Sequence, residues 1–250
     1  MIDSHCHLDA CEPPDAELVA RARDAGVTRL ATVGTDGASI QRALSAADAH
    51  DGVIAIVGRH PHDTAGFDAA ALEEIERAAA DQRARAIGET GLDYYRDHAP
   101  RADQRRAFEA QLELAGRIGM PAVIHTRAAE EDTFAVLREY GGQVQAVILH
   151  CFSTPGRLEE SVEHGYFCSF AGNVTYPKAT ELQAAARQIP AELLLVETDS
   201  PYLAPQPRRG RPNEPANVTH TARFIADLRG ISYEELERTV EENAARVFGW

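Results

Sequence analysis

Short apolar segments rich in β-branched residues alternate with longer amphipathic segments along the whole chain. Eight of the short segments are predicted β-strands, because runs that are apolar throughout are typical of strands buried on both faces of a parallel sheet. The predicted strands are Met1–Leu8, Val27–Val33, Val53–Gly58, Ala84–Glu89, Ala122–His125, Val144–His150, Tyr166–Phe170 and Leu193–Thr198. The alternation therefore predicts a chain built from repeated β-α units.

The segments between the strands have the three- and four-residue apolar spacing of helices. They are Ala16–Ala25, Ile40–His50, Ala69–Ala80, Ala102–Ile118, Glu131–Tyr140, Gly156–His164 and Ala179–Gln188, with a closing pair at Val218–Leu228 and Tyr233–Val247. Eight such units in 250 residues are expected for an α/β protein with the (β/α)8 TIM-barrel fold, forming a single domain over residues 1–250. A doubly wound open sheet is the alternative, but no glycine-rich phosphate-binding motif follows the first strand.

The balance of charge limits the kinds of partner. The chain has 25 Lys and Arg against 39 Asp and Glu, for a formal net charge of −14. A broad basic surface that coats DNA is therefore not expected. A phosphate substrate stays open, because bound divalent cations can supply positive charge locally.

Several features predict a cytoplasmic protein with no membrane partner. The four cysteines form no C-x-x-C pair, and we expect them to be reduced. The first residues have no basic and apolar regions typical of a secretory signal. No apolar stretch approaches the roughly 18 residues needed to span a bilayer. A monomer is expected, although the sequence does not determine the oligomeric state.

Two histidines near the end of the first predicted strand form an H-x-H motif. His5 and His7 are two residues apart, and alternate residues of a strand project from the same face. If that face is the interior of a barrel, both imidazoles can bind one ion. Histidine pairs at this spacing are also common outside metal sites, so the motif needs further ligands to support it.

Four other polar side chains each interrupt an apolar run at its carboxyl end. They are Glu89, His125, His150 and Asp199. Burial of isolated imidazoles and carboxylates would be costly without partners. In a barrel the carboxyl ends of all strands converge on the face that holds active sites. We therefore predict a metal site formed by His5, His7, Glu89, His125, His150 and Asp199.

This ligand set contains nitrogen and carboxylate oxygen without thiolate, which suits Zn²⁺, Mn²⁺ or Mg²⁺. Six ligands are too many for one tetrahedral catalytic ion, so we expect two divalent ions with Glu89 as the bridge. Asp199 is expected to bind one ion and to act as general base, which makes Glu89 and Asp199 the predicted catalytic residues. Cys151 directly follows His150, so its side chain is expected to point away from the site and to pack rather than react.

Two loops near the predicted site are candidates for substrate binding. His60 and His62 follow the third strand and are predicted substrate contacts, which could also touch the metal or be ordinary loop histidines. Arg208, Arg209 and Arg211 follow the last strand and are predicted to bind phosphate, because guanidinium groups match phosphate oxygens. A solvated basic loop is the alternative for these three arginines, which we call the arginine loop.

The motifs together resemble those of the TatD family of metal-dependent deoxyribonucleases, within the amidohydrolase-like superfamily of TIM barrels. The matching blocks are Asp3–Asp9, His60–His62, Gly88–Tyr95, Ile124–Arg127, His150–Ser153, Glu197–Pro205 and Arg211–Pro215. Arg59 and Thr154 depart from residues that are frequent in the family, and neither is a predicted ligand. The resemblance implies a divalent-metal-dependent phosphodiesterase acting on DNA, as a 3′ exonuclease on single strands or 3′ ends. It also implies that the six predicted ligands are the metal ligands of the family.

An amide or ester hydrolase on the same barrel, such as an aminoacyl-tRNA deacylase, is the main alternative function. Many binuclear amidohydrolases bridge their metals with a carboxylated lysine on the fourth strand. The only lysine of this chain is Lys178, which follows the seventh predicted strand, and Glu89 stands where that bridge would be. The lysine content therefore favours the nuclease-like subgroup. A metal-binding scaffold without turnover is disfavoured by the complete ligand set.

Overall fold

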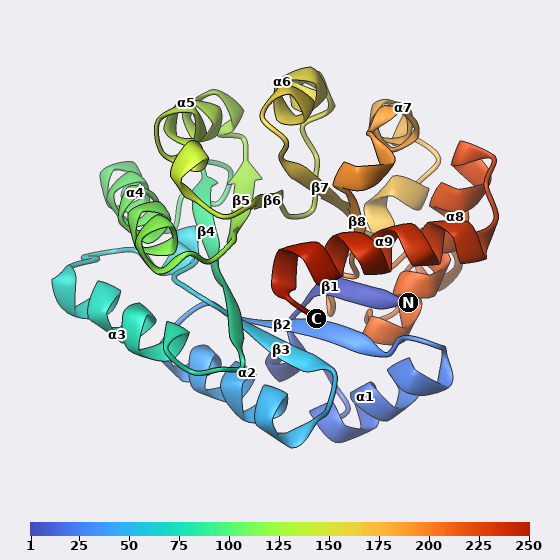
Figure 1. Ribbon diagram of the computed structural model, residues 1–250, viewed down its shortest axis with the longest axis horizontal. Coiled ribbons are helices and arrows are strands. Elements are labelled where there is room, and N and C mark those ends of the chain that lie inside the picture. The colour runs from blue at the N-terminus through green and yellow to red at the C-terminus, as the bar shows by residue number, and fades with distance from the viewer.

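Eight parallel strands form one sheet in the order β1 to β8 in the computed structural model, which describes residues 1–250 (Figure 1). The strands are β1 (Ile2–Cys6), β2 (Arg29–Gly34), β3 (Val53–Val57), β4 (Ala84–Asp93), β5 (Ala122–Arg127), β6 (Val147–Leu149), β7 (Phe167–Phe170) and β8 (Leu194–Val196). Beyond the last strand, Cys6 pairs with Ser200, and the Asp199 amide donates to the His5 carbonyl at 2.9 Å. These contacts close the sheet, so the predicted TIM barrel is confirmed.

Nine α-helices surround the barrel (Figure 1). They are α1 (Asp15–Asp24), α2 (Gly37–Ala49), α3 (Ala69–Ala79), α4 (Arg101–Ile118), α5 (Glu130–Tyr140), α6 (Leu158–Glu163), α7 (Thr180–Gln188), α8 (Val218–Arg229) and α9 (Tyr233–Phe248). The last helix lies over the amino-terminal ends of β1 and β8, where the Met1 amine contacts Glu237 and Glu241 and the Asn243 amide donates to the Leu194 carbonyl. The opposite, carboxyl-terminal face of the barrel is left free of this helix.

The fourth strand is longer than its sequence pattern predicts. It continues to Asp93, whereas the prediction ended it at Glu89. Gly88 and Gly91 have positive φ values, and a side chain on either would overlap the neighbouring strand β5. Glycine here lets β4 run close to β5 beyond the apolar part of the strand. Glu89 consequently lies inside the strand, and not at its end as predicted.

Apolar side chains form most of the interior, but buried polar ones gather at one end of the barrel. Asp3, His5, Glu89, Asp93 and Glu197 are all at most 2% exposed. They lie on β1 and β4 or directly after β8. Burial of so many ionisable groups requires partners among themselves or bound ions.

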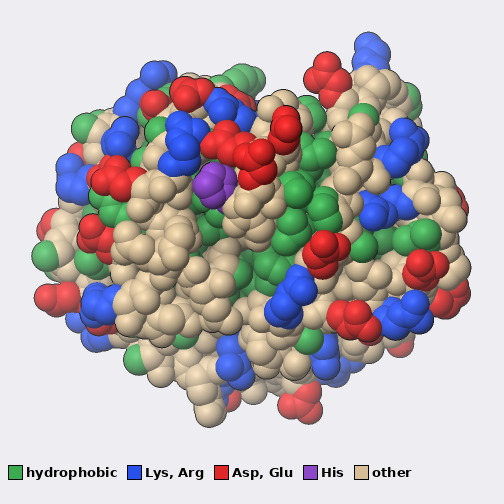
Figure 2. Space-filling view, turned by 45° about the horizontal axis from the view of Figure 1, so that its top comes forward, with side chains coloured by type: hydrophobic (Ala, Val, Ile, Leu, Met, Phe, Trp, Pro, Cys, Tyr) green, Lys and Arg blue, Asp and Glu red, His purple; other side chains and the backbone are tan.

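The outer surface carries charges of both signs. Acidic and basic side chains are interspersed over the face shown in Figure 2. On this face the basic side chains do not form one continuous patch. None of the helices combines the length and the apolar character needed to cross a membrane.

Candidate metal centre

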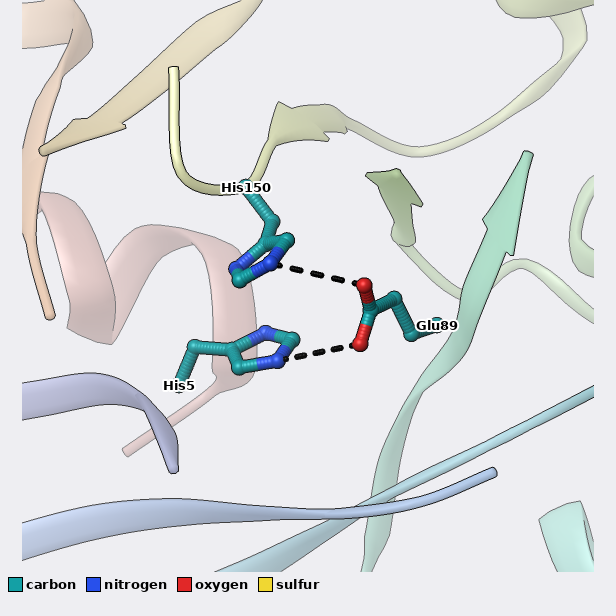
Figure 3. Close-up of side chains that lie close together, drawn as sticks. All are labelled: His5, Glu89 and His150. Carbon is teal, nitrogen blue, oxygen red and sulfur yellow. Dashed lines mark ion pairs between the residues drawn. The ribbon is translucent and has the colours of Figure 1, made fainter. Parts of the chain in front are cut away.

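Glu89 lies at the centre of the buried polar cluster (Figure 3). Its Oε2 is 3.3 Å from Nε2 of His5, and its Oε1 is 3.4 Å from Nε2 of His150. Oε1 is also 2.7 Å from Nδ1 of His125. The two carboxylate oxygens thus face imidazoles from three different strands or strand ends, as a bridging carboxylate would.

The remaining two predicted ligands lie on the β1 and β8 side of Glu89. Nε2 of His7 is 3.3 Å from Nε2 of His5 and 3.5 Å from Oδ1 of Asp199. His5, His7 and Asp199 form one group whose potential ligand atoms lie within 4.8 Å of one another, and His5, Glu89 and His150 form another. The structure therefore brings all six predicted ligands together.

Hydrogen bonds across the barrel closure hold Asp199 beside His5. Asp3 accepts from the Thr198 hydroxyl at 2.6 Å and from the Thr198 amide at 2.8 Å. Strand β8 has already ended at Val196, and Asp199 has a left-handed backbone with φ 54°. Its side chain is thereby turned toward His7.

His60 lies within the cluster of predicted ligands, and not only at the mouth of the site. Its Nε2 is 3.5 Å from Oε1 of Glu89, and it forms a third potential ligand group with Glu89 and His125. Burial lowers the pKa of His60 to about 4, so the imidazole is neutral at pH 7, the form that binds metal. His62 lies farther out, and its side chain is 27% exposed.

Asp93 links these histidines and was not foreseen from the sequence. Its Oδ2 is 3.2 Å from Nε2 of His125 and 2.9 Å from Nε2 of His62. Burial raises its pKa, but hydrogen bonds from His125 and from the Arg96 amide outweigh this and keep the pKa below its ordinary value. Glu89 and Asp93 lie on the same strand with an odd number of residues between them, so their side chains project from the same face. This spacing was the signal in the sequence that could have identified Asp93.

Glu197 contacts His150 in the same way that Asp93 contacts His125. Its Oε1 is 2.9 Å from Nδ1 of His150 and accepts from the Cys151 amide at 2.8 Å. A carboxylate that holds the distal ring nitrogen fixes the orientation of a histidine whose other nitrogen binds metal. The signal in the sequence was an acidic residue two positions before Asp199, directly after an apolar strand.

The expectation that Cys151 points away from the site is wrong. Its thiol lies within 4.8 Å of the ligand atoms of His150 and Glu197. Strand β6 has ended at Leu149, and Cys151 has φ 44°, so the alternation of a strand does not extend to it. Burial raises the pKa of this thiol well above its ordinary value, which is unsuited to a nucleophilic thiolate.

A profile of the TatD related DNase family matches residues 2–249. The chain belongs to this family. It is 41% identical to an uncharacterized metal-dependent hydrolase named TatD from Mycobacterium tuberculosis, over 100% of this chain and 98% of the relative. It is 36% identical to a 3′-5′ ssDNA/RNA exonuclease TatD of Klebsiella pneumoniae, over 93% of this chain and 91% of that protein. The crystal structure of YJJV, a TatD homologue from Escherichia coli, superposes with a TM-score of 0.91 at 26% identity, covering 100% of this chain and 98% of that one.

The charges in this TatD-family centre fit divalent cations. Glu89, Asp93, Glu197 and Asp199 are buried or nearly so, and their ion pairs are with histidines alone, without any arginine or lysine. Burial lowers the pKa of His150, but the charges of Glu197 and Glu89 outweigh it and raise that pKa to about 10. Such an excess of carboxylate, with imidazole nitrogen and no thiolate among the predicted ligands, suits Zn²⁺, Mn²⁺ or Mg²⁺.

The arginine loop of this TatD-family chain lies outside the cluster. All three of its arginines are exposed, and none forms an ion pair with a carboxylate. Arg209 stacks on Tyr176 with its guanidinium carbon 4.1 Å from the ring centroid, and the Gln206 amide ties the loop to Thr175. The loop belongs to the connection between Asp199, after β8, and helix α8.

Proposed function

We propose that the protein is a divalent-metal-dependent phosphodiesterase that removes nucleotides from the 3′ end of single-stranded DNA. The observation that carries the proposal is the cluster of six nitrogen and oxygen ligands, with Glu89 at its centre, in a chain of the TatD related DNase family. The Klebsiella relative, named as a 3′-5′ exonuclease of single-stranded DNA and RNA, supports the choice of substrate.

Two divalent ions fit the arrangement of ligands. One ion would be held by His5, His7 and Asp199. The other would be held by His125 and His150, and Glu89 would contribute to both sites. When bound, the ions would supply positive charge to the scissile phosphate and make an attacking water more acidic. His60 is a further candidate ligand, because its Nε2 faces the same oxygen of Glu89 as His125 does.

Asp199 is the residue best placed to accept the proton of the attacking water. Burial raises the pKa of this carboxyl, but the hydrogen bond with His7 and the charge of His150 outweigh it, so its pKa lies below the ordinary value. It is therefore ionised at neutral pH, and its side chain remains 13% exposed, so solvent can reach it. The arginine loop would hold phosphate oxygens of the neighbouring nucleotides.

The experiment is a digestion of single-stranded DNA labelled at its 5′ end, with Mg²⁺, Mn²⁺ or Zn²⁺ added separately. We expect progressive shortening from the 3′ end, and none in EDTA or with a blocked 3′ end. Asp199→Asn should reduce the rate at least about 100-fold while the melting temperature is retained. Asp227→Asn, an exposed change on α8, is the matched control. DNA that stays intact with every metal, while an amide or ester substrate is hydrolysed, would refute the proposal.

Two finer properties belong to the same proposal. We propose a monomer, because one chain supplies all six ligands and no second copy is needed to complete the site. Sedimentation equilibrium tests this, and a dimer at micromolar concentration contradicts it. We also propose a cytoplasmic location, supported by four free cysteines, which suit a reducing compartment.

A further inference from the structure

Two tyrosines are the most exposed large apolar side chains of the molecule. Tyr95 is 64% exposed and Tyr202 is 58% exposed, whereas the other large apolar side chains are buried or only partly exposed. An exposed aromatic ring gains nothing from the core, so two of them near one site indicate a surface that binds something.

Both tyrosines adjoin the candidate metal centre. The ring of Tyr202 lies 6.2 Å from the ring of His7, in an edge-on arrangement, and its amide donates to the Asp199 carbonyl. The Tyr95 amide donates at 2.9 Å to Oδ1 of Asp93, whose other oxygen contacts His125. The backbone of one tyrosine is therefore hydrogen-bonded to each half of the site, through Asp93 or Asp199.

The two tyrosines lie on opposite sides of the barrel mouth. Tyr95 follows β4 and Tyr202 follows β8, and these strands are four places apart in a closed sheet of eight (Figure 1). The carboxylate of Glu89 reaches from β4 toward His5 on β1 and His150 after β6, inside the ring of strands (Figure 3). A linear polymer bound across the barrel mouth would therefore contact one tyrosine on each side of the metal centre.

Positive charge accompanies the ring on the β4 side. The guanidinium carbon of Arg127 lies 4.1 Å from the centroid of the Tyr95 ring, and that of Arg96 lies 5.8 Å from it. Neither arginine forms an ion pair with a carboxylate, unlike Arg21, Arg117 and Arg138 on the outer helices. A guanidinium stacked on a ring keeps its N–H edge available for a phosphate.

We propose that Tyr95 and Tyr202 each stack on an unpaired base, on either side of the phosphodiester held at the metal centre, and that Arg127 binds a phosphate of the same strand. This rests on the proposed function and deepens it. Exposed rings next to unpaired arginines are the chemistry that binds single-stranded nucleic acid without sequence preference. In a duplex both faces of each base are already covered, so the rings favour single strands.

The test compares variants that keep or remove the aromatic ring. Tyr95→Leu and Tyr202→Leu should each raise KM for a single-stranded oligonucleotide about tenfold, within the range of stacking on one base, with kcat changed less than KM. Tyr95→Phe and Tyr202→Phe should retain the wild-type KM. Tyr233→Leu is the matched control, because that ring carries a stacked arginine, Arg223, on helices α8 and α9. Melting curves verify that each variant is folded.

An oligonucleotide with abasic sites at the nucleotides flanking the cleaved bond separates stacking from other effects. Wild-type protein should bind it about 100-fold more weakly than the normal strand, because two tenfold stacking contacts are lost. Each single leucine variant keeps one ring and should still lose about tenfold, whereas the double leucine variant should no longer distinguish the two strands. If the wild type cleaves DNA but the leucine variants match it on both substrates, the stacking proposal is wrong and the proposed function stands. If the wild type cleaves no nucleic acid at all, the proposed function fails first.

Discussion

Replacement of Glu197 by glutamine tests whether the carboxylates around the ligands hold them in place. Glu197 is buried, and its Oε1 lies 2.9 Å from Nδ1 of His150. The amide of glutamine keeps the shape of the side chain but removes its charge. His150 then loses the group that orients its ring and increases the basicity of its other nitrogen, which faces Glu89 at 3.4 Å.

The expected effect is a loss of metal affinity by a factor of about 10 to 100, the usual result of removing such a partner. This factor corresponds to about 1.4 to 2.7 kcal/mol of binding free energy. The lower part of the range is expected, because the backbone amide of Cys151 still holds the substituted side chain. Water screens the lost charge little, since the Glu197 side chain is only 1% exposed.

The assay is a competition for Zn²⁺ or Mn²⁺ between the protein and a fluorescent chelator, at one pH and ionic strength. Glu159→Gln, which changes an exposed glutamate of α6, is the matched control and should bind metal as the wild type does. The melting temperature of the metal-free proteins shows whether the fold is retained. A folded Glu197→Gln variant with wild-type affinity would refute the positioning role of Glu197.

Three further predictions concern the same centre and its surroundings. Asp93→Asn should weaken metal binding about 10- to 100-fold through His125, and calorimetry with unchanged affinity would contradict this. Because the pKa of His150 is raised to about 10, metal must displace its proton at neutral pH, so apparent affinity should rise about tenfold per pH unit from pH 6 to 8. A pH-independent affinity would show that no proton is displaced. Alanine at all three positions of the arginine loop should raise KM for DNA and flatten its dependence on salt, and an unchanged salt dependence would remove the loop from phosphate binding.

The fold and the six ligands could be predicted because both depend on local patterns. Each strand is short and apolar, and a polar residue that interrupts such a run near its carboxyl end falls on the active face of a barrel. Glu89 was identified in this way although its strand does not end there. The extension of β4 depends on the close approach to β5 that Gly88 and Gly91 allow, and such a contact between strands is not visible in one segment of sequence.

The supporting carboxylates were harder to foresee for a related reason. Asp93 and Glu197 act through histidines that are distant in sequence, His125 and His150, so their role appears only when the strands are placed side by side. The position of Cys151 was predicted wrongly because strand alternation was assumed for a residue with left-handed backbone. Local periodicity therefore predicts which residues face the site, and the tertiary structure determines which of them support one another.

The proposed action on a polyanion has to be reconciled with a net charge of −14. Several arginines on the outer helices pair with neighbouring carboxylates, as in the pairs Arg117–Glu76 and Arg138–Glu160. Arg127, the last residue of β5, and the arginine loop, after β8, have no such partners and lie at the barrel end that holds the ligands. A negative overall charge raises the requirement for local positive charge, and two bound cations would meet it where the buried carboxylates gather. Binding of DNA should consequently depend on metal far more than on the surface as a whole.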